Sequence, residues 1–361
     1  MKVLFLPNWK VPVLEKDDDS IQAPDKYIKG EPYWFFRFFP PETEVDIIDF
    51  QEKNILHKLE KKVFKTYIWQ SILAFRKRKS YDVVISHGAQ SGIVFSFLRN
   101  FCSKKKPEHY ILDIGGMNGA RNNWPEISIL KLALRSNPYI ICHSRIIIEN
   151  YKNTFKNLVN RSVFIPFGVD TDYFSPFENN SGEKYILSFG TGKRDYDTLF
   201  KAWSELNYPD VKLKIIGRIL KKGEQLPPRI ELTDKVSIHK LIEEINNSLF
   251  VVIPLPVYNY SYGQMSFLQS MSLGKTVVVT KTPSSIDYLT DNRGSFFVEP
   301  FDTEDLKAKI RFLLDNPEIL SQSNDKARPY ILQNFSEKLM GKRIADFIAP
   351  NLMQRKSLYL R

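Results

Sequence analysis

The feature that most constrains this chain is an alternation of short apolar runs with segments of helical period. The runs are continuous and rich in Val and Ile, as expected of strands buried on both faces of a parallel sheet. The segments between them place apolar residues three and four positions apart, which is typical of amphipathic helices. The alternation predicts doubly wound α/β sheets. The expected strands are Lys2–Leu6, Val45–Ile48, Val83–Ser86, Tyr110–Asp113, Tyr139–Cys142, Val163–Ile165, Tyr185–Phe189, Leu213–Ile216, Val236–Ile238, Phe250–Pro254, Thr276–Thr280 and Gly294–Val298.

The strand series divides at Asp170–Glu183, a segment rich in turn formers. The chain has 361 residues, which suits two domains of roughly 150–180 residues each. We therefore expect an N-terminal Rossmann-like domain over 1–168 and a second one over 169–335. A last helix begins at the N-cap residue Ser336 and is ended by Pro350, and the C-terminal helix segment 336–361 joins the first domain.

The composition excludes several classes of protein. Hydrophobic residues make up 43 % and aromatic residues 13 % of the chain, which excludes disorder as the main state. The two cysteines, Cys102 and Cys142, fit neither a disulfide framework nor a zinc site. No apolar run is long enough to span a membrane, and Met1–Lys10 does not read as a signal peptide. These features favour a cytoplasmic, reduced protein.

The positive charge is unevenly distributed. The net charge is +11, and residues 1–165 hold 26 basic against 17 acidic side chains. Much of the excess lies in Lys53–Lys79, which is amphipathic at helical spacing and carries Tyr67 and Trp69. Such a segment suits an anionic membrane surface, so we expect peripheral association with the inner face of the cell membrane. The alternative is a core-facing helix with a solvated basic face. A basic nucleic-acid-binding protein is a rival class, which the absence of a stacking platform disfavours.

One candidate phosphate-binding turn lies within Tyr185–Trp203. After the expected strand come Gly190 and Gly192, then Lys193 and Arg194, and a helix beginning near Asp195. The glycines let backbone N–H groups point at a ligand, and a helix N-terminus favours anions. Two fixed positive charges can hold a diphosphate. The alternative is a solvated basic turn.

A second candidate turn lies within Val251–Thr280. Ser261, Tyr262, Gly263 and Gln264 stand where a helix begins, so its free N–H groups also suit an anion. Gln269 follows about one and a half turns later, on a side that could face the same ligand. The alternative for Gln269 is a surface amide.

These segments, together with Ile165–Asp170, occur in an order that resembles the C-terminal domain of the retaining family 4 glycosyltransferases, group 1, of the GT-B fold. The similar region covers about 163–348, and the N-terminal half is similar only in architecture. The resemblance implies two Rossmann-like domains facing a central cleft. It places the family's phosphate-binding lysine on Arg194, with Lys193 as the nearest substitute for its arginine. The ribose-binding glutamate falls on Gln269, and the glutamate expected on the donor sugar falls on Ser261 or Tyr260.

The resemblance also implies a catalytic position in the first domain. Asp113, before Gly115 and Gly116, occupies the place of a family residue near the reacting sugar, where a carboxylate could orient an acceptor hydroxyl or stabilise an oxocarbenium-like transition state. The alternative for Asp113 is a turn cap. His87 and His143, which also follow expected strands, are more often structural than catalytic.

The function that follows is transfer of a sugar, with retention, from a nucleotide-sugar donor to a glycan or lipid-linked acceptor in surface polysaccharide or glycolipid assembly. We expect no metal and no further cofactor. A sugar-nucleotide epimerase of the same fold is the alternative. The predicted catalytic residues are Asp113 and Arg194, and the predicted donor-binding residues are Gly190, Lys193, Arg194, Gly217, Ser261, Tyr262, Gly263, Gln264 and Gln269.

Overall fold

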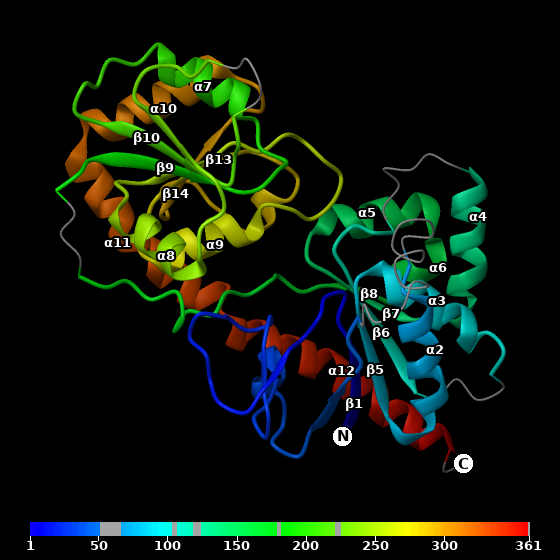
Figure 1. Cartoon of the computed structure of the whole chain (residues 1–361). Helices are drawn as coiled ribbons and strands as arrows, with labels where there is room; N and C mark the ends of the chain where they lie inside the picture. The colour runs from blue at the N-terminus through cyan, green and yellow to red at the C-terminus, as the bar shows by residue number, and fades with distance from the viewer. Residues whose placement is uncertain (51–65, 103–106, 118–123, 179–181, 221–224, 360–361) are drawn as a thin grey trace. The chain divides into compact units, whose positions relative to one another are not determined.

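The chain forms two compact units, each built around a parallel sheet (Figure 1). The computed structural model describes residues 1–50, 66–102, 107–117, 124–178, 182–220 and 225–359. The first unit comprises Met1–Pro166, Asn259–Ser261 and Met340–Arg361. The second comprises Phe167–Tyr258 and Tyr262–Leu339. The C-terminal helix therefore begins in the second unit and continues in the first.

The sheet of the first unit has six strands in the order β4-β1-β5-β6-β7-β8, and all of its neighbouring strands pair in parallel. The chain runs from β1 outward to β4 and then returns to the other side of β1, so the winding direction changes between β1 and β5. The strands are β1 (Lys2–Leu6), β4 (Glu44–Ile47), β5 (Val83–His87), β6 (Glu108–Asp113), β7 (Tyr139–Cys142) and β8 (Ser162–Phe164).

Helices cover both faces of this sheet, as the alternation of side chains along β6 shows. His109 is hydrogen-bonded to Ser96 of α3 on one face. The ring of the next residue, Tyr110, lies 5.9 Å from that of Phe347 of α12 on the other. The helices of this unit are α2 (Ile68–Lys77), η3 (Arg78–Ser80), α3 (Ala89–Arg99), α4 (Trp124–Ala133), η4 (Leu134–Ser136), α5 (Arg145–Thr154), α6 (Lys156–Val159) and α12 (Glu337–Tyr359).

Aromatic packing fills the connection between β1 and β4. This segment contains the short strands β2 (Val13–Leu14) and β3 (Tyr27–Ile28) and the 3₁₀ helix η1 (Trp34–Phe38). Phe5 of β1 contacts Trp34, Phe35 and Phe36 of η1 edge-on. A Cβ added to Gly341 of α12 would lie 2.6 Å from the Phe35 carbonyl oxygen. Glycine at 341 therefore lets α12 approach the aromatic segment closely.

The sheet of the second unit has the order β11-β10-β9-β12-β13-β14, and its neighbouring strands are again parallel. Its winding direction changes between β9 and β12. The strands are β9 (Tyr185–Phe189), β10 (Lys212–Ile216), β11 (Ile230–Thr233), β12 (Val251–Ile253), β13 (Val277–Thr280) and β14 (Ser295–Val298). This arrangement is the doubly wound architecture that the alternation predicted.

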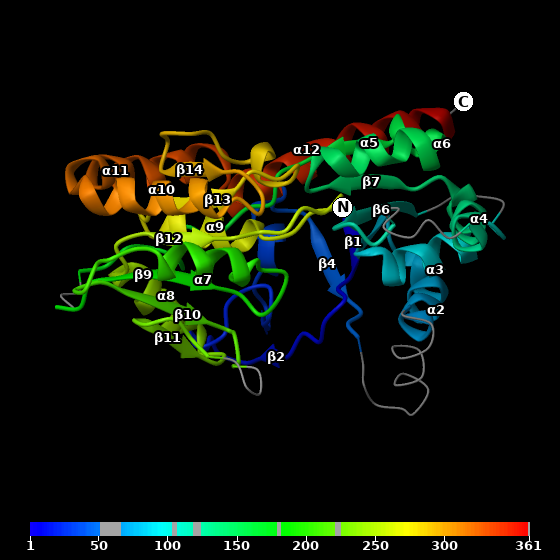
Figure 2. The same cartoon turned by 90° about the horizontal axis from the view of Figure 1, so that it is seen from above.

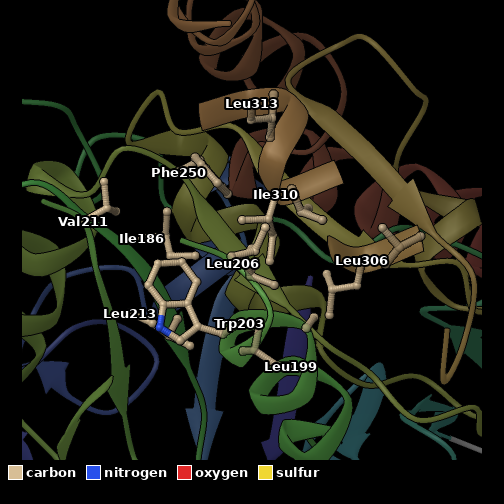
Figure 3. Close-up of a cluster of buried hydrophobic side chains, with 14 of the residues drawn as sticks. Ile186, Leu199, Trp203, Leu206, Val211, Leu213, Phe250, Leu306, Ile310 and Leu313 are labelled. Atoms are coloured by element: carbon tan, nitrogen blue, oxygen red, sulfur yellow. The ribbon is translucent and has the colours of Figure 1, made fainter. Parts of the chain in front are cut away.

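One face of the second sheet packs into a core around Trp203, which is fully buried (Figure 3). Trp203 comes from α7, Ile186 and Leu213 from the strands, and Ile310 from α10. Helix α10 also packs against β14 and α11 (Figure 2). The helices are α7 (Tyr196–Ser204), α8 (Ile238–Asn247), α9 (Gln264–Ser272), η5 (Ser285–Asp287), α10 (Thr303–Asp315) and α11 (Pro317–Asn334).

Two local predictions were wrong. The strand expected at Val236–Ile238 is absent: the Ser237 hydroxyl caps the Lys240 N–H at 3.2 Å, and α8 begins at Ile238. The strand that precedes α8 is instead β11, and the burial of its side chains alternates because it lies at the edge of the sheet. Pro350 does not end the last helix, since α12 continues to Tyr359. Proline removes one helical hydrogen bond, and the rest of this long helix persists around it.

Candidate functional site

The segments after β9 and β12 meet at the point where the second sheet changes direction. In doubly wound sheets ligands bind outside the carboxyl ends of the strands at such a point. The backbone N–H of Asp195, after β9, donates to the Pro254 carbonyl, after β12, at 2.9 Å. Asp195 also caps α7 by accepting a hydrogen bond from the Thr198 N–H. The two segments are therefore fixed to each other at the switch point.

The turn after β9 has a backbone that favours glycine. Gly190 and Gly192 adopt φ angles of 136° and 147°, and Lys193 adopts 52°. A Cβ added to Gly190 would lie 2.5 Å from Nη2 of Arg194. A Cβ added to Gly217, at the end of β10, would lie 3.1 Å from the Gly190 carbonyl carbon. The absence of a side chain at Gly190 thus makes room for the Arg194 guanidinium. The absence of a side chain at Gly217 lets the end of β10 approach the turn.

Arg194 places a half-buried positive charge at this point. Its Nε donates to the Phe189 carbonyl at 3.1 Å, and its Nη2 donates to the Ser266 hydroxyl at 2.7 Å. Burial lowers the pKa of the guanidinium from its ordinary value. In the part of the chain that the structure describes, no carboxylate forms an ion pair with Arg194. A charge held by neutral groups in this way is available to an anionic ligand.

The contact with Ser266 brings Arg194 to the first turn of α9. Gly263 is the N-cap of that helix, with φ 82°, and a Cβ there would lie 2.9 Å from the Leu255 methyls. The Gln264 side chain donates to the Ser284 hydroxyl, so Gln264 is buried and engaged. The positive end of the helix and the guanidinium reinforce each other. Sequence reasoning missed Ser266, although its position in the first helical turn was a usable signal.

Two further predicted residues lie in the same unit. Gln269 is only 6 % exposed, and within the described ranges its side-chain amide makes no hydrogen bond with the protein. Lys193 is exposed, and its Nζ lies 5.9 Å from the centre of the Tyr258 ring. That ring packs edge-on against Tyr262 at 5.1 Å. The structure thus brings Gly190, Lys193, Arg194, Gly217 and the start of α9 to one switch point.

Ser261 is grouped differently from its neighbours. Asn259–Ser261 belongs to the first unit, whereas Tyr262 belongs to the second. The predicted four-residue turn is therefore divided between the units, and the role of Ser261 in donor binding stays a prediction.

Asp113 ends β6 in the first unit and is fully buried. One carboxylate oxygen accepts the N–H groups of Gly115 and Gly116, each at 2.9 Å, and the other accepts the Tyr151 hydroxyl. Burial raises the pKa of this carboxyl, and the three hydrogen bonds oppose that rise. Both carboxylate oxygens of Asp113 thus accept hydrogen bonds from the protein, as the turn-cap alternative requires. Its catalytic role stays a prediction.

His87 and His143 of the first unit are buried and neutral near pH 7. Burial and then the nearby His143 lower the pKa of His87 to about 3, and its Nδ1–H donates to the Asn8 side chain at 3.2 Å. Burial lowers the pKa of His143 to about 4, and its Nδ1–H donates to the Ile165 carbonyl at 2.7 Å. These contacts support the structural interpretation of both residues.

The predicted membrane segment lies partly outside the described residues, because the structure describes it only from Thr66 onward. Of its two interfacial aromatics, Trp69 is exposed, but Tyr67 is buried, and its ring centre lies 4.6 Å from that of Phe50 in a tilted arrangement. The expectation for Tyr67 was wrong because its ring completes the core beside β1. Across the described ranges, no helix is long and apolar enough to cross a membrane, and no cluster of three metal-binding side chains occurs.

Residues 183–316 match the family described as Glycosyl transferases group 1. The second unit thus contains a group 1 glycosyltransferase domain. This group 1 domain includes both β9 and β12 and therefore the whole switch point. The chain is also 25 % identical over 273 residues to an uncharacterized glycosyltransferase of Methanocaldococcus jannaschii, covering 73 % of this chain and 74 % of that protein.

Solved glycosyltransferase structures share the fold of both units. Sucrose-phosphate synthase from Thermosynechococcus elongatus aligns with a TM-score of 0.69 at 13 % identity, covering 98 % of this chain and all of that one. HepE of Anabaena, in complex with UDP-glucose, aligns with a TM-score of 0.67 at 12 % identity, covering 97 % of this chain and all of that one. The fold class is therefore GT-B, with two Rossmann-like units around parallel sheets.

Proposed function

We propose that this protein is a glycosyltransferase that transfers a sugar from a nucleotide-sugar donor to a glycan or lipid-linked acceptor. The observation that carries the proposal is the position of Arg194. Its guanidinium has no carboxylate partner among the described residues and is hydrogen-bonded to the first turn of α9 at the switch point of the group 1 domain. A diphosphate is the anion that such a site suits, because it can engage the guanidinium and the positive end of the helix together.

The chemistry follows from where charge develops. When the bond between the sugar and the diphosphate breaks, negative charge accumulates on the leaving phosphate. Arg194 and the α9 N-terminus are already oriented toward an anion, so they stabilise that charge without reorganising. Lys193 adds a second, flexible cation at the rim. We propose that these groups act without a metal ion and that the sugar is transferred with retention of configuration.

The nucleoside part of the donor would contact Gln269. Its buried amide offers a donor and an acceptor, which can bond adjacent ribose hydroxyls. UDP is the first nucleotide to examine, because HepE, which shares this fold, was crystallised with UDP-glucose.

We propose that the acceptor is bound by the first unit. The turn at Asp113–Gly116 lies at the carboxyl end of the first sheet, where acceptor contacts are expected in this fold class. Because both Asp113 oxygens are engaged, Asp113 would act by fixing this turn. A cytoplasmic enzyme docked on an anionic membrane would meet a lipid-linked acceptor there.

The test is calorimetric titration of the full chain with UDP, followed by product analysis with UDP-glucose. We expect UDP binding that Arg194→Ala weakens about 10- to 150-fold and that the exposed control Lys338→Gln retains. Release of sugar to water or to an added glycan supports transfer, whereas conversion of the donor to an isomer without any acceptor supports the epimerase. Unchanged turnover in Arg194→Ala would overturn the assignment of this site.

A further inference from the structure

Two neighbouring helices of the first unit expose a cluster of large apolar side chains. Phe101 is 74 % exposed, Ile129 65 %, Leu132 44 % and Phe97 38 %. Single exposed apolar residues are ordinary on a soluble protein, but several gathered on one surface indicate contact with a partner or a membrane. We name these four residues the α3–α4 ridge.

Hydrogen bonds hold the two halves of the ridge together. The Asn100 side-chain amide donates to the Leu132 carbonyl at 2.9 Å and to the Ala133 carbonyl at 3.3 Å. On one side of this junction the rings of Phe97 and Phe101 pack edge-on, 5.4 Å apart. On the other side Ile129 and Leu132 are three residues apart and share a face of α4. The ridge is therefore a fixed surface.

The charges around the ridge are almost all positive. The helices α2, η3, α3, α4 and η4 contain one carboxylate, Glu126, in their printed sequence. Helix α2 packs along α3. The exposed cations of these elements are Arg76, Lys77, Lys79, Lys131 and Arg135. Where the structure describes the chain, none of these five forms an ion pair with a carboxylate. The surface therefore combines exposed apolar side chains with cations that no internal partner neutralises.

We propose that the α3–α4 ridge docks the protein on an anionic lipid bilayer, with the apolar side chains entering the headgroup region and the flanking cations contacting lipid phosphates. This combination is the one that interfacial membrane binding requires, because apolar burial and attraction to anionic lipid then act together. An acidic protein could form ion pairs with the cations. An anionic bilayer accounts more directly for the four exposed apolar side chains of the ridge.

The docking surface is separate from the candidate catalytic loops. Helix α3 runs back from the carboxyl end of β5 toward the start of β6, so Phe97 and Phe101 lie toward the amino ends of the strands. His87, Asp113 and His143 lie at or just after the carboxyl ends. Substitutions in the ridge therefore leave these loops untouched. The inference deepens the proposed function, because it assigns the membrane contact to residues other than 53–65.

Vesicle co-sedimentation of the full chain tests the proposal. The vesicles are phosphatidylcholine alone or phosphatidylcholine with a third of phosphatidylglycerol. We expect binding to the mixed vesicles only. The pair Phe101→Ser and Ile129→Ser removes half of the ridge, and the pair Lys131→Gln and Arg135→Gln removes two cations. Loss of two cations near an anionic surface is expected to weaken binding about thirtyfold.

Matched controls lie in the second unit. Ile286→Ser removes an exposed apolar side chain, and Lys326→Gln with Lys338→Gln removes two exposed cations. These variants should bind vesicles as the unmodified chain does. The proposal would be overturned if the chain bound neutral and mixed vesicles equally, if it bound neither, or if both ridge variants bound as the unmodified chain does. It would also be overturned if the chain captured an acidic protein but bound no vesicle.

UDP titration in parallel separates this proposal from the proposed function. Ridge variants that no longer bind vesicles but still bind UDP support the docking proposal. A chain that binds mixed vesicles through the ridge but binds no nucleotide also supports docking, while contradicting the assignment of the donor site.

Discussion

Nη2 of Arg194 donates a hydrogen bond to the Ser266 hydroxyl at 2.7 Å, joining the turn after β9 to the first turn of α9. The two residues are 72 positions apart in the chain. The bond fixes a positive charge beside a helix N-terminus, and each of these features favours an anion. The orientation of this guanidinium, as well as its charge, should therefore determine affinity for a diphosphate.

The Arg194 site allows charge and orientation to be separated. Arg194→Lys keeps the charge but loses the planar donor pair, whereas Ser266→Ala keeps the guanidinium but removes its anchor. Because charged hydrogen bonds contribute about 1.5–3 kcal/mol, Arg194→Ala should weaken UDP binding by about 10- to 150-fold. We expect a smaller loss, about fivefold, in Ser266→Ala. Calorimetric titration measures each, and equal affinities across the series would contradict the site.

Gly190 and Gly192 provide a matched pair for the turn itself. Both have positive φ, so alanine at either position should cost about 1–2 kcal/mol of unfolding free energy through backbone strain. Only at Gly190 would the added Cβ meet the Arg194 guanidinium, since Gly192 has no atom within 4 Å. Urea denaturation should show the larger loss for Gly190→Ala, and UDP binding should fall in that variant alone. Similar UDP affinities in the two variants would argue against a role for the Arg194 position.

Tyr151 and Asp113 test the structural role of the buried carboxylate. Tyr151→Phe leaves one oxygen of Asp113 buried without its hydroxyl donor, which should lower the unfolding free energy by about 1–3 kcal/mol. The pKa of Asp113 should rise further, because the hydroxyl is among the groups that oppose the effect of burial. Chemical denaturation at two pH values measures both effects. A fully stable Tyr151→Phe variant would contradict the turn-fixing role.

The buried histidines predict sensitivity to acid. The pKa of His87 is lowered to about 3 and that of His143 to about 4, whereas an unfolded chain binds these protons near pH 6.5. Between those values the unfolded state holds more protons, so the unfolding free energy falls as the pH decreases below 6.5. The loss should be up to about 1.4 kcal/mol per pH unit for each histidine.

Denaturation of His87→Gln across pH 7 to 4 checks this prediction. The variant should lose stability less steeply on acidification than the unmodified chain does. His239→Gln, at an exposed helical position, is the control and should leave the slope unchanged. A slope that His87→Gln does not alter would show that another group controls the acid response.

The strands that sequence reasoning located best are those buried on both faces, because their continuous apolar runs carry the signal by themselves. Strand β9 was predicted with its exact bounds, Tyr185–Phe189. The edge strand β11 was missed because only alternate residues are covered, which leaves Ile230–Thr233 without such a run. Tyr67 was assigned to a membrane face because helical spacing alone does not show which face of a helix the rest of the protein covers.

The sequence by itself determined the βα alternation, the two-domain division and the glycine turn with Lys193 and Arg194, because these are local patterns of polarity and backbone freedom. The tertiary structure decided which of these residues meet. The order β10-β9-β12 places the ends of β9 and β12 at one switch point, and that placement brings Arg194 to Ser266. The contact is non-local, so it depends on strand order and packing, which no single segment of the sequence specifies.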